Sequence, residues 1–149
     1  MNEDWKSMSS KKGWLLEGIY ATSLHSYQYE NELTLLSSEF TLTLQHPDSL
    51  EKVYWKLGWI EDEDWDDLLI FNEQQIPKQN SYNSSFSFQH GKIDSIHGYG
   101  LTKNQQELLT SIVIKLKQYY VTIQSGPAIE VKITKEAPAP EKLDDLLHR

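Results

Sequence analysis

An acidic run with an embedded tryptophan is the part of this sequence best suited to binding chemistry. Six carboxylates fall within seven residues between Glu61 and Asp67, and they account for most of the net charge of −8. Carboxylates steer a basic partner towards a surface, and tryptophan side chains anchor interfaces. We therefore take as candidate partner-binding residues Trp59, Glu61, Asp62, Glu63, Asp64, Trp65, Asp66 and Asp67.

Two other interpretations of the acidic run stay open. The run can be a solvated helix start, in which Asp62 or Asp64 caps the helix, the helix dipole favours the acids, and Trp65 turns into the core. It can also bind a divalent cation, but it lacks the glycine and the alternate ligand spacing of a calcium loop. No metal is therefore expected.

Residues with catalytic potential are few. There is no cysteine, which excludes a thiolate nucleophile and a disulfide, and no serine lies in a Gly-x-Ser-x-Gly elbow. Gly98-Tyr99-Gly100 lacks the third glycine and the lysine of a phosphate loop, and it predicts a tight turn. His90 and His97, on neighbouring strands of one hairpin with Asp94 nearby, supply too few ligands for a metal site. We expect no enzyme and no cofactor.

Composition narrows the class of protein. Hydrophobic residues make up 38% of the 149 residues, which is typical of a globular protein. The acidic net charge disfavours direct nucleic-acid binding, which needs clustered lysine and arginine. The first residues have neither the basic nor the apolar region of a signal peptide, and no apolar run is long enough to span a membrane. We expect a cytoplasmic protein away from the membrane.

The elements that must position these residues are predicted from periodicity. Strand-like segments lie at residues 14–22 and 38–45, a hairpin at 85–96 turns at His90-Gly91, and a final hairpin joins 120–123 to 129–133. A short helix is predicted over 50–57, ended by Gly58. A helix of about five turns is predicted from Thr102 as N-cap. Its apolar stripe consists of Leu108, Leu109, Ile112, Val113, Leu116 and Tyr119 or Tyr120.

These elements predict an α+β fold. A mainly antiparallel sheet carries one long amphipathic helix and one or two short helices on one face. Residues 1–12 are expected to be a flexible N-terminal segment, and residues 13–134 a single α+β domain. Residues 135–149 are expected to be a flexible tail, because Ala-Pro-Ala-Pro at 137–140 has the composition of an extended linker.

Three features together resemble a known class of proteins. They are the stretch from His97 to Thr102 with the helix expected after it, the strand from Ser125 to Val131, and the acidic, Trp-rich middle. These features resemble immunity proteins that accompany polymorphic secreted toxins, including LXG-type toxins, in Gram-positive bacteria. The resemblance, over residues 13–134, implies a small, acidic, cytoplasmic and non-enzymatic protein. It also implies a partner, a cognate nuclease-like toxin domain whose active site the protein covers.

The leading hypothesis is therefore an inhibitor that binds a basic protein, most simply a toxin domain. A phage-type nucleic-acid mimic that blocks a defence enzyme is an alternative that would use the same acidic run. Another is a small enzyme or ligand-binding domain that uses the Gly98–Gly100 turn and the histidines, and a structural or adaptor role also stays open. The sequence leaves the oligomeric state undetermined.

Overall fold

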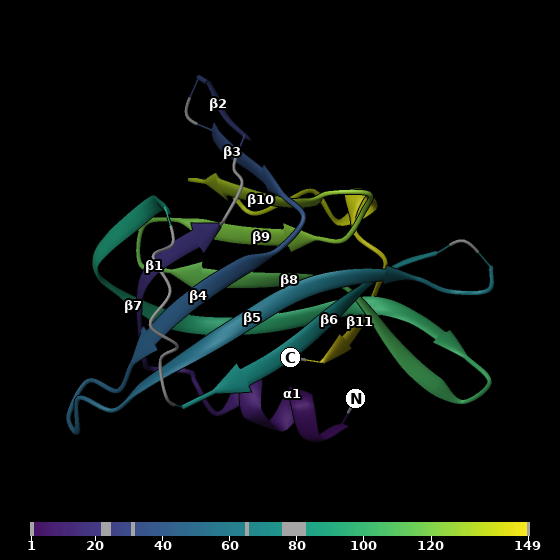
Figure 1. Cartoon of the computed structure of the whole chain (residues 1–149), viewed down its shortest axis with the longest axis horizontal. Coiled ribbons are helices and arrows are strands. Elements are labelled where there is room, and N and C mark those ends of the chain that lie inside the picture. The colour runs from purple at the N-terminus through teal and green to yellow at the C-terminus, as the bar shows by residue number, and fades with distance from the viewer. Residues whose placement is uncertain (1, 22–24, 31, 65, 76–82, 149) are drawn as a thin grey trace.

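The computed structural model describes residues 2–21, 25–30, 32–64, 66–75 and 83–148, and it is dominated by β-strands (Figure 1). One α-helix opens the described chain, α1 (Asn2–Ser9), and a short 3₁₀ helix, η1 (Pro140–Lys142), lies near its end. The strands are β1 (Leu15–Ala21), β2 (His25–Tyr29), β3 (Glu32–Ser37), β4 (Phe40–Gln45), β5 (Lys52–Glu61), β6 (Asp67–Gln74), β7 (Asn83–Lys103), β8 (Gln106–Leu116), β9 (Tyr120–Gln124), β10 (Ile129–Thr134) and β11 (Asp145–His148).

The strands form two antiparallel layers that share the long strand β7. The hydrogen-bonded order is β2-β3-β10-β9-β8-β7-β1-β4-β5-β6, and β11 pairs with β7 outside this path. Residues 83–92 of β7 pair with β1, whereas residues 93–103 pair with β8. In Figure 1, β4, β5 and β6 cross in front of β7 and β8, and β6 lies against β8. Two sheets stacked face to face in this way enclose one core between them.

The core is made by the inner faces of both layers. Trp55, Leu42 and Leu44 contribute from one layer, and Ile112 and Ile123 contribute from the other, all of them fully buried. In β5 and β10, and in β4 from Leu42 onward, the buried residues alternate with less buried ones, because successive side chains of a strand point to opposite faces. The predicted strands at residues 14–22, 38–45 and in the final hairpin are confirmed as β1, β4, β9 and β10.

The predicted α+β fold is wrong, because the long helix from Thr102 does not exist. Thr102 and Lys103 end β7, and Asn104 and Gln105 form a two-residue turn with φ angles of 51° and 64°. Positive φ at both positions is the geometry of a tight hairpin turn, and β8 follows directly. Residues 109–114 of β8 are buried on both faces of the strand. The apolar residues at 108, 109, 112, 113 and 116 also satisfy helical spacing, which explains the error.

The predicted short helix at 50–57 is also wrong. Leu50 lies in a loop with φ of 63°, and β5 begins at Lys52. Val53, Trp55 and Leu57 alternate with more exposed neighbours, so a period of two was present in this segment. Gly58 lies inside the strand rather than after a helix.

The predicted hairpin at 85–96 is replaced by continuous strand. His90-Gly91 makes no turn, and Gly98-Tyr99-Gly100 lies within β7 instead of ending a strand. A strand long enough to take part in both layers has to bend between them, and glycines make this easier. The candidate metal pair of His90 and His97 therefore sits along one strand and not on two facing strands.

The chain segments expected to be flexible hold regular structure. In α1, Trp5 and Met8 are buried in the core cluster, three residues apart on one helical face. At the other end, η1 and β11 follow the Ala-Pro-Ala-Pro segment, and β11 pairs with residues 98–100 of β7. The C-terminal segment therefore folds back onto the sheet.

Candidate functional site

The acidic run forms the tight loop between β5 and β6. Asp62 organises this loop: its Oδ1 accepts hydrogen bonds from the backbone N–H groups of Asp64 at 2.9 Å and Asp66 at 2.8 Å. The backbone N–H of Asp62 donates to the carbonyl of Asp66 at 3.0 Å. Asp62 thus caps a turn between two strands, and the interpretation of the run as a helix start is wrong.

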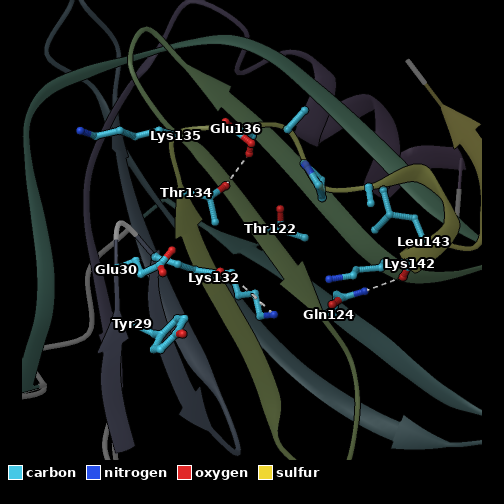
Figure 2. A pocket seen from close by; sticks show the side chains of 14 residues that line it. Tyr29, Glu30, Thr122, Gln124, Lys132, Thr134, Lys135, Glu136, Lys142 and Leu143 are labelled. Carbon is cyan, nitrogen blue, oxygen red and sulfur yellow. Dashed lines mark hydrogen bonds and ion pairs between the residues drawn. The ribbon is translucent and has the colours of Figure 1, made fainter.

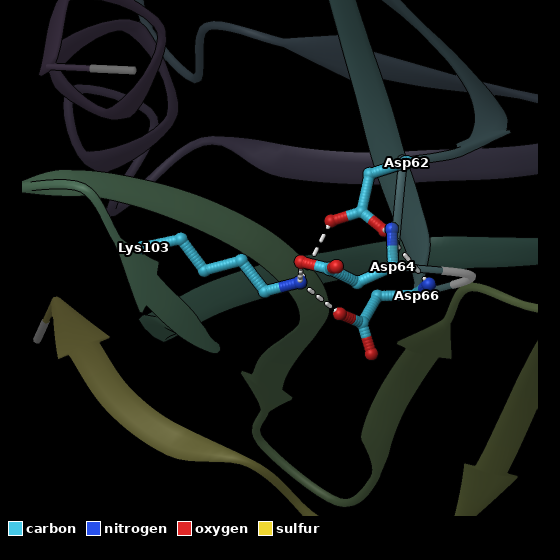
Figure 3. Close-up of polar contacts among 4 residues, drawn as sticks. All are labelled: Asp62, Asp64, Asp66 and Lys103. Carbon is cyan, nitrogen blue, oxygen red and sulfur yellow. Dashed lines mark hydrogen bonds and ion pairs between the residues drawn. The ribbon is translucent and has the colours of Figure 1, made fainter.

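A lysine from a distant hairpin closes the acidic loop. Lys103, at the tip of the β7–β8 hairpin, donates to Asp62 Oδ2 at 2.9 Å, to Asp64 Oδ2 at 2.8 Å and to Asp66 Oδ2. Figure 3 shows the three carboxylates around the single ammonium. The three aspartates converge because Asp62 Oδ1 holds the backbone of Asp64 and Asp66 in the turn and Lys103 holds their carboxylates.

The ion cluster shifts the titration of its members. The hydrogen bond from Lys103, followed by those from the backbone of Asp66 and Asp64, holds the pKa of Asp62 below its ordinary value of 3.8. The hydrogen bonds to Asp64, Asp66 and Asp62 raise the pKa of Lys103 above 10.5. One ammonium cannot neutralise three carboxylates, so the cluster keeps a negative charge at neutral pH.

Replacing Lys103 with glutamine is expected to raise the pKa of Asp62 towards 3.8. Because this pKa is lowered in the folded state, the interaction stabilises the fold above pH 3.8, and the effect is lost as the pH falls through the lowered value. The hydrogen bonds that raise the pKa of Lys103 stabilise the fold at pH values below 10.5. This stabilisation is lost as the pH rises through the raised pKa.

Carboxylate chemical shifts followed by NMR during a pH titration measure this change. Lys117 is an exposed lysine of the loop between β8 and β9, and Lys117→Gln is the matched control. The same pKa of Asp62 in the Lys103→Gln variant and in the control would contradict the assigned role of Lys103.

The remaining predicted site residues are spread around the cluster. Glu61 and Glu63 are exposed, and Asp67 is half-buried at the start of β6, paired in register with Glu61. Trp59 is half-buried and packs against the core, so only part of its ring can reach a partner. Trp65 lies outside the described residues. Of the eight predicted partner-binding residues, three therefore form ion pairs with Lys103.

Lys103 was missed by reasoning from the sequence. The signal that could have found it is Asn104, since an asparagine in a two-residue connection between strand-forming runs is typical of a hairpin turn. Treating this segment as a helix hid that turn. The ion pairs of Lys103 with the acidic loop form only because two hairpins meet in space. Residues 62 and 103 are far apart in the sequence, so no local pattern connects them.

The same three aspartates have the spacing of cation ligands. Their nearest carboxylate oxygens lie within 4.8 Å of one another, and residues 62, 64 and 66 alternate, contrary to the expectation that such spacing is missing. The ammonium of Lys103 already lies among these oxygens. A divalent cation would have to displace it, so we assign these oxygens to Lys103.

A cavity of about 520 Å³ lies under the C-terminal segment, against the outer face of β9 and β10 (Figure 2). Lys132 in its wall is bridged to Glu32 at 3.4 Å and to Glu130 at 3.6 Å. Burial lowers the pKa of Lys132, but Glu130 and Glu32 outweigh it and raise that pKa. The wall holds as many acidic as basic side chains, so it favours neither an anionic nor a cationic ligand.

The histidines show no shared site within the described side chains. His25 is exposed, and His97 is half-buried on β7. The Nδ1 of His46 accepts the backbone N–H groups of Asp48 and Ser49, both at 3.1 Å, which stabilises the β4–β5 loop. The described histidine side chains thus have separate surroundings.

No protein-family model, curated protein or solved structure matches this chain. None of the helices in the described residues has the length and apolar character needed to cross a membrane.

Proposed function

We propose that this chain is a non-catalytic inhibitor that binds a basic protein partner through its acidic loop, residues 61–67. The observation that carries the proposal is the excess of carboxylates over ammonium groups at an exposed hairpin. Three aspartates share Lys103, and Asp64 keeps 71% of its side chain exposed even so. Glu61 and Glu63 stand beside them, also exposed.

Such a loop acts mainly on encounter with a partner. Exposed carboxylates contribute little to stability, but clustered on one side of a molecule they raise the association rate with a basic surface. Three aspartates of the loop are also preordered, because Asp62 Oδ1 accepts the backbone N–H groups of Asp64 and Asp66 and Lys103 holds all three carboxylates. Binding therefore loses less conformational freedom than the ordering of a flexible acidic segment would.

The specific form that we propose is immunity to a toxin. A nuclease-like toxin domain presents lysine and arginine to bind nucleic acid, and an acidic protein can cover that surface. The resemblance to immunity proteins of LXG-type toxin systems supports this form. We propose a cytoplasmic location, where such a toxin would act on the producing cell.

Neutralising the loop is expected to weaken the complex. The variant Glu61→Gln, Glu63→Gln, Asp67→Asn removes three charges without touching the three aspartates that hold Lys103. We expect its association rate with the basic domain encoded by a neighbouring toxin gene to fall about tenfold at low salt, with a flatter salt dependence. Stopped-flow or surface plasmon resonance measurements at several salt concentrations give both quantities.

The matched control removes three exposed carboxylates outside the loop, Asp48→Asn, Glu51→Gln and Glu141→Gln. It has the same net charge as the loop variant, so any difference reports where the charges lie. If the two variants had equal association rates and equal salt dependence, the proposal would be contradicted. The alternative function, a nucleic-acid mimic, would be favoured if the gene for this chain lay in a phage operon and the protein inhibited a defence enzyme.

A further inference from the structure

Two exposed isoleucines lie on β5 and β6 close to the acidic loop. Ile60 on β5 and Ile70 on β6 keep 50% and 42% of their surface exposed. Apolar side chains scattered singly over a surface are ordinary, whereas a contiguous exposed patch with a polar rim marks an interaction site. Whether these two isoleucines form one patch depends on the strand register.

The register places Ile60 and Ile70 on the same outer face of the sheet. Gly58 pairs with Ile70. Ile60 pairs with Leu68, two positions further along both strands, so the two isoleucines are diagonal neighbours. Such neighbours lie about 7–8 Å apart, within reach of one contacting side chain. Trp59 packs against the core, and successive side chains of a strand alternate between faces, so Ile60 and Ile70 point away from the core.

Gly58 leaves the sheet open beside these isoleucines. A β-carbon at Gly58 would have no atom of the described residues within 4 Å. The pairing of β5 with β6 runs without a register shift, so this glycine forms no bulge. A glycine inside a regular strand often marks a place where another molecule approaches the backbone closely. We call Gly58, Ile60 and Ile70 the apolar patch.

Polar residues border the apolar patch at both ends. Glu61 and Asp67 form the next pair along the strands on one side, and they begin and end the acidic loop. Lys56 and Asn72 form the next pair on the same face at the other side. An apolar centre within a polar rim is the usual anatomy of a protein–protein interface. The acidic loop and the apolar patch therefore form one continuous surface.

We propose that the apolar patch anchors the basic partner, with an apolar side chain of that partner seated over Gly58 against both isoleucines. The identity of the partner rests on the proposed function. Charges steer two proteins together, whereas a few desolvated contacts near the centre of an interface carry most of the affinity. Trp59, a predicted anchor, packs against the core, so the anchoring role passes to its neighbour Ile60.

The charge beside the apolar patch favours a basic partner over a second copy of this chain. The ion cluster of three aspartates and Lys103 keeps a negative charge and adjoins the patch through Glu61. A second copy carries the same net charge of −8, which opposes its approach. Lysines or arginines around the apolar side chain of a basic partner would instead meet the loop carboxylates.

The complex with the basic domain encoded by a neighbouring toxin gene tests the anchor. The double variant Ile60→Thr, Ile70→Thr keeps a β-branched side chain on both strands and removes apolar surface. We expect its dissociation rate to rise about tenfold and its association rate to stay within about twofold, because lost contacts appear mainly in dissociation. The matched control is Tyr27→Thr, since Tyr27 is 54% exposed on β2, at the opposite end of the strand order.

A second variant tests the open space over Gly58 without removing a side chain. Gly58→Gln places a polar group where the apolar side chain of the partner would sit, and we expect dissociation about tenfold faster. Its urea midpoint should stay close to that of the wild type, because the space around the new β-carbon is open. If the urea midpoint shows that the double variant has lost its fold, Gly58→Gln decides alone. Wild-type dissociation rates in the folded variants would overturn the proposal.

The kinetic measurements separate this inference from the proposed function. If the triple loop variant associates more slowly than its control while the double variant dissociates like Tyr27→Thr, the acidic loop stands and the anchor is overturned. If the double variant dissociates faster while the triple loop variant associates like its control, the anchor stands and the proposed role of the loop fails. A dimer that light scattering detects in the wild type, and that the double variant converts to monomers, would assign the apolar patch to a second copy and overturn the proposal.

Discussion

Gly100→Ala is expected to lower the free energy of unfolding by more than about 4 kcal/mol, a loss at the far end of what single substitutions cause. A β-carbon at Gly100 would lie 1.9 Å from the carbonyl oxygen of Leu108 and 2.9 Å from its carbonyl carbon. Leu108 belongs to the neighbouring strand β8, so the β7–β8 hairpin would have to separate. That hairpin also carries Lys103 to the acidic loop.

Gly58→Ala is the matched control for this substitution. Gly58 also lies inside a strand, but a β-carbon there would have nothing within 4 Å. Alanine in an open strand position should leave stability unchanged or raise it by roughly 0.5–1 kcal/mol. Urea denaturation followed by tryptophan fluorescence compares the two variants, and similar midpoints would show that β7 and β8 are further apart than described.

Glu73→Ala is expected to cost about 3 kcal/mol, because it leaves a buried ammonium without its counter-charge. Lys11 Nζ lies 3.0 Å from Glu73 Oε1, with only 8% and 17% of these side chains exposed. The same oxygen accepts a hydrogen bond from Trp55 Nε1 at 2.9 Å. The substitution therefore removes the acceptor of a core tryptophan as well as the counter-charge of Lys11.

The control is an exposed ion pair on the same layer of the fold. Lys52 and Glu17 lie 3.6 Å apart with side chains 50% and 33% exposed, and such pairs contribute at most about 1 kcal/mol. Lys52→Ala should therefore have a small effect in the same urea titration. If Glu73→Ala costs no more than Lys52→Ala, then the Lys11–Glu73 pair does not tie the N-terminal segment to β6 as described.

The local pattern predicted a strand correctly where apolar and polar residues alternate along the sequence. Phe40, Leu42 and Leu44 alternate with threonines in β4, and that strand was predicted correctly. In β8 the pattern fails, because residues 109–114 are buried on both faces. The apolar residues on both sides of Thr110 and Ser111 fit helical spacing, so periodicity alone could not decide between a helix and a strand.

The position of the N-terminal segment is a second feature that the sequence could not predict. Most of residues 1–12 are polar, and nothing in that stretch says what Trp5 and Met8 would pack against. The answer lies on β7, where a β-carbon at Gly98 would come within 2.8 Å of the Trp5 ring. The tryptophan therefore packs directly on the backbone of a strand more than ninety residues away.

The sequence by itself determined the chemistry available to this protein: an acidic run, no cysteine, and apolar segments sufficient for one core. Only the tertiary structure decided how the acids are paired, because Lys103 reaches the acidic loop from a hairpin that is distant in the chain. Charge and side-chain type are properties of single residues and can be read directly. Which cation meets which carboxylate depends on strand pairing over long separations, and periodicity within one segment carries no information about that pairing.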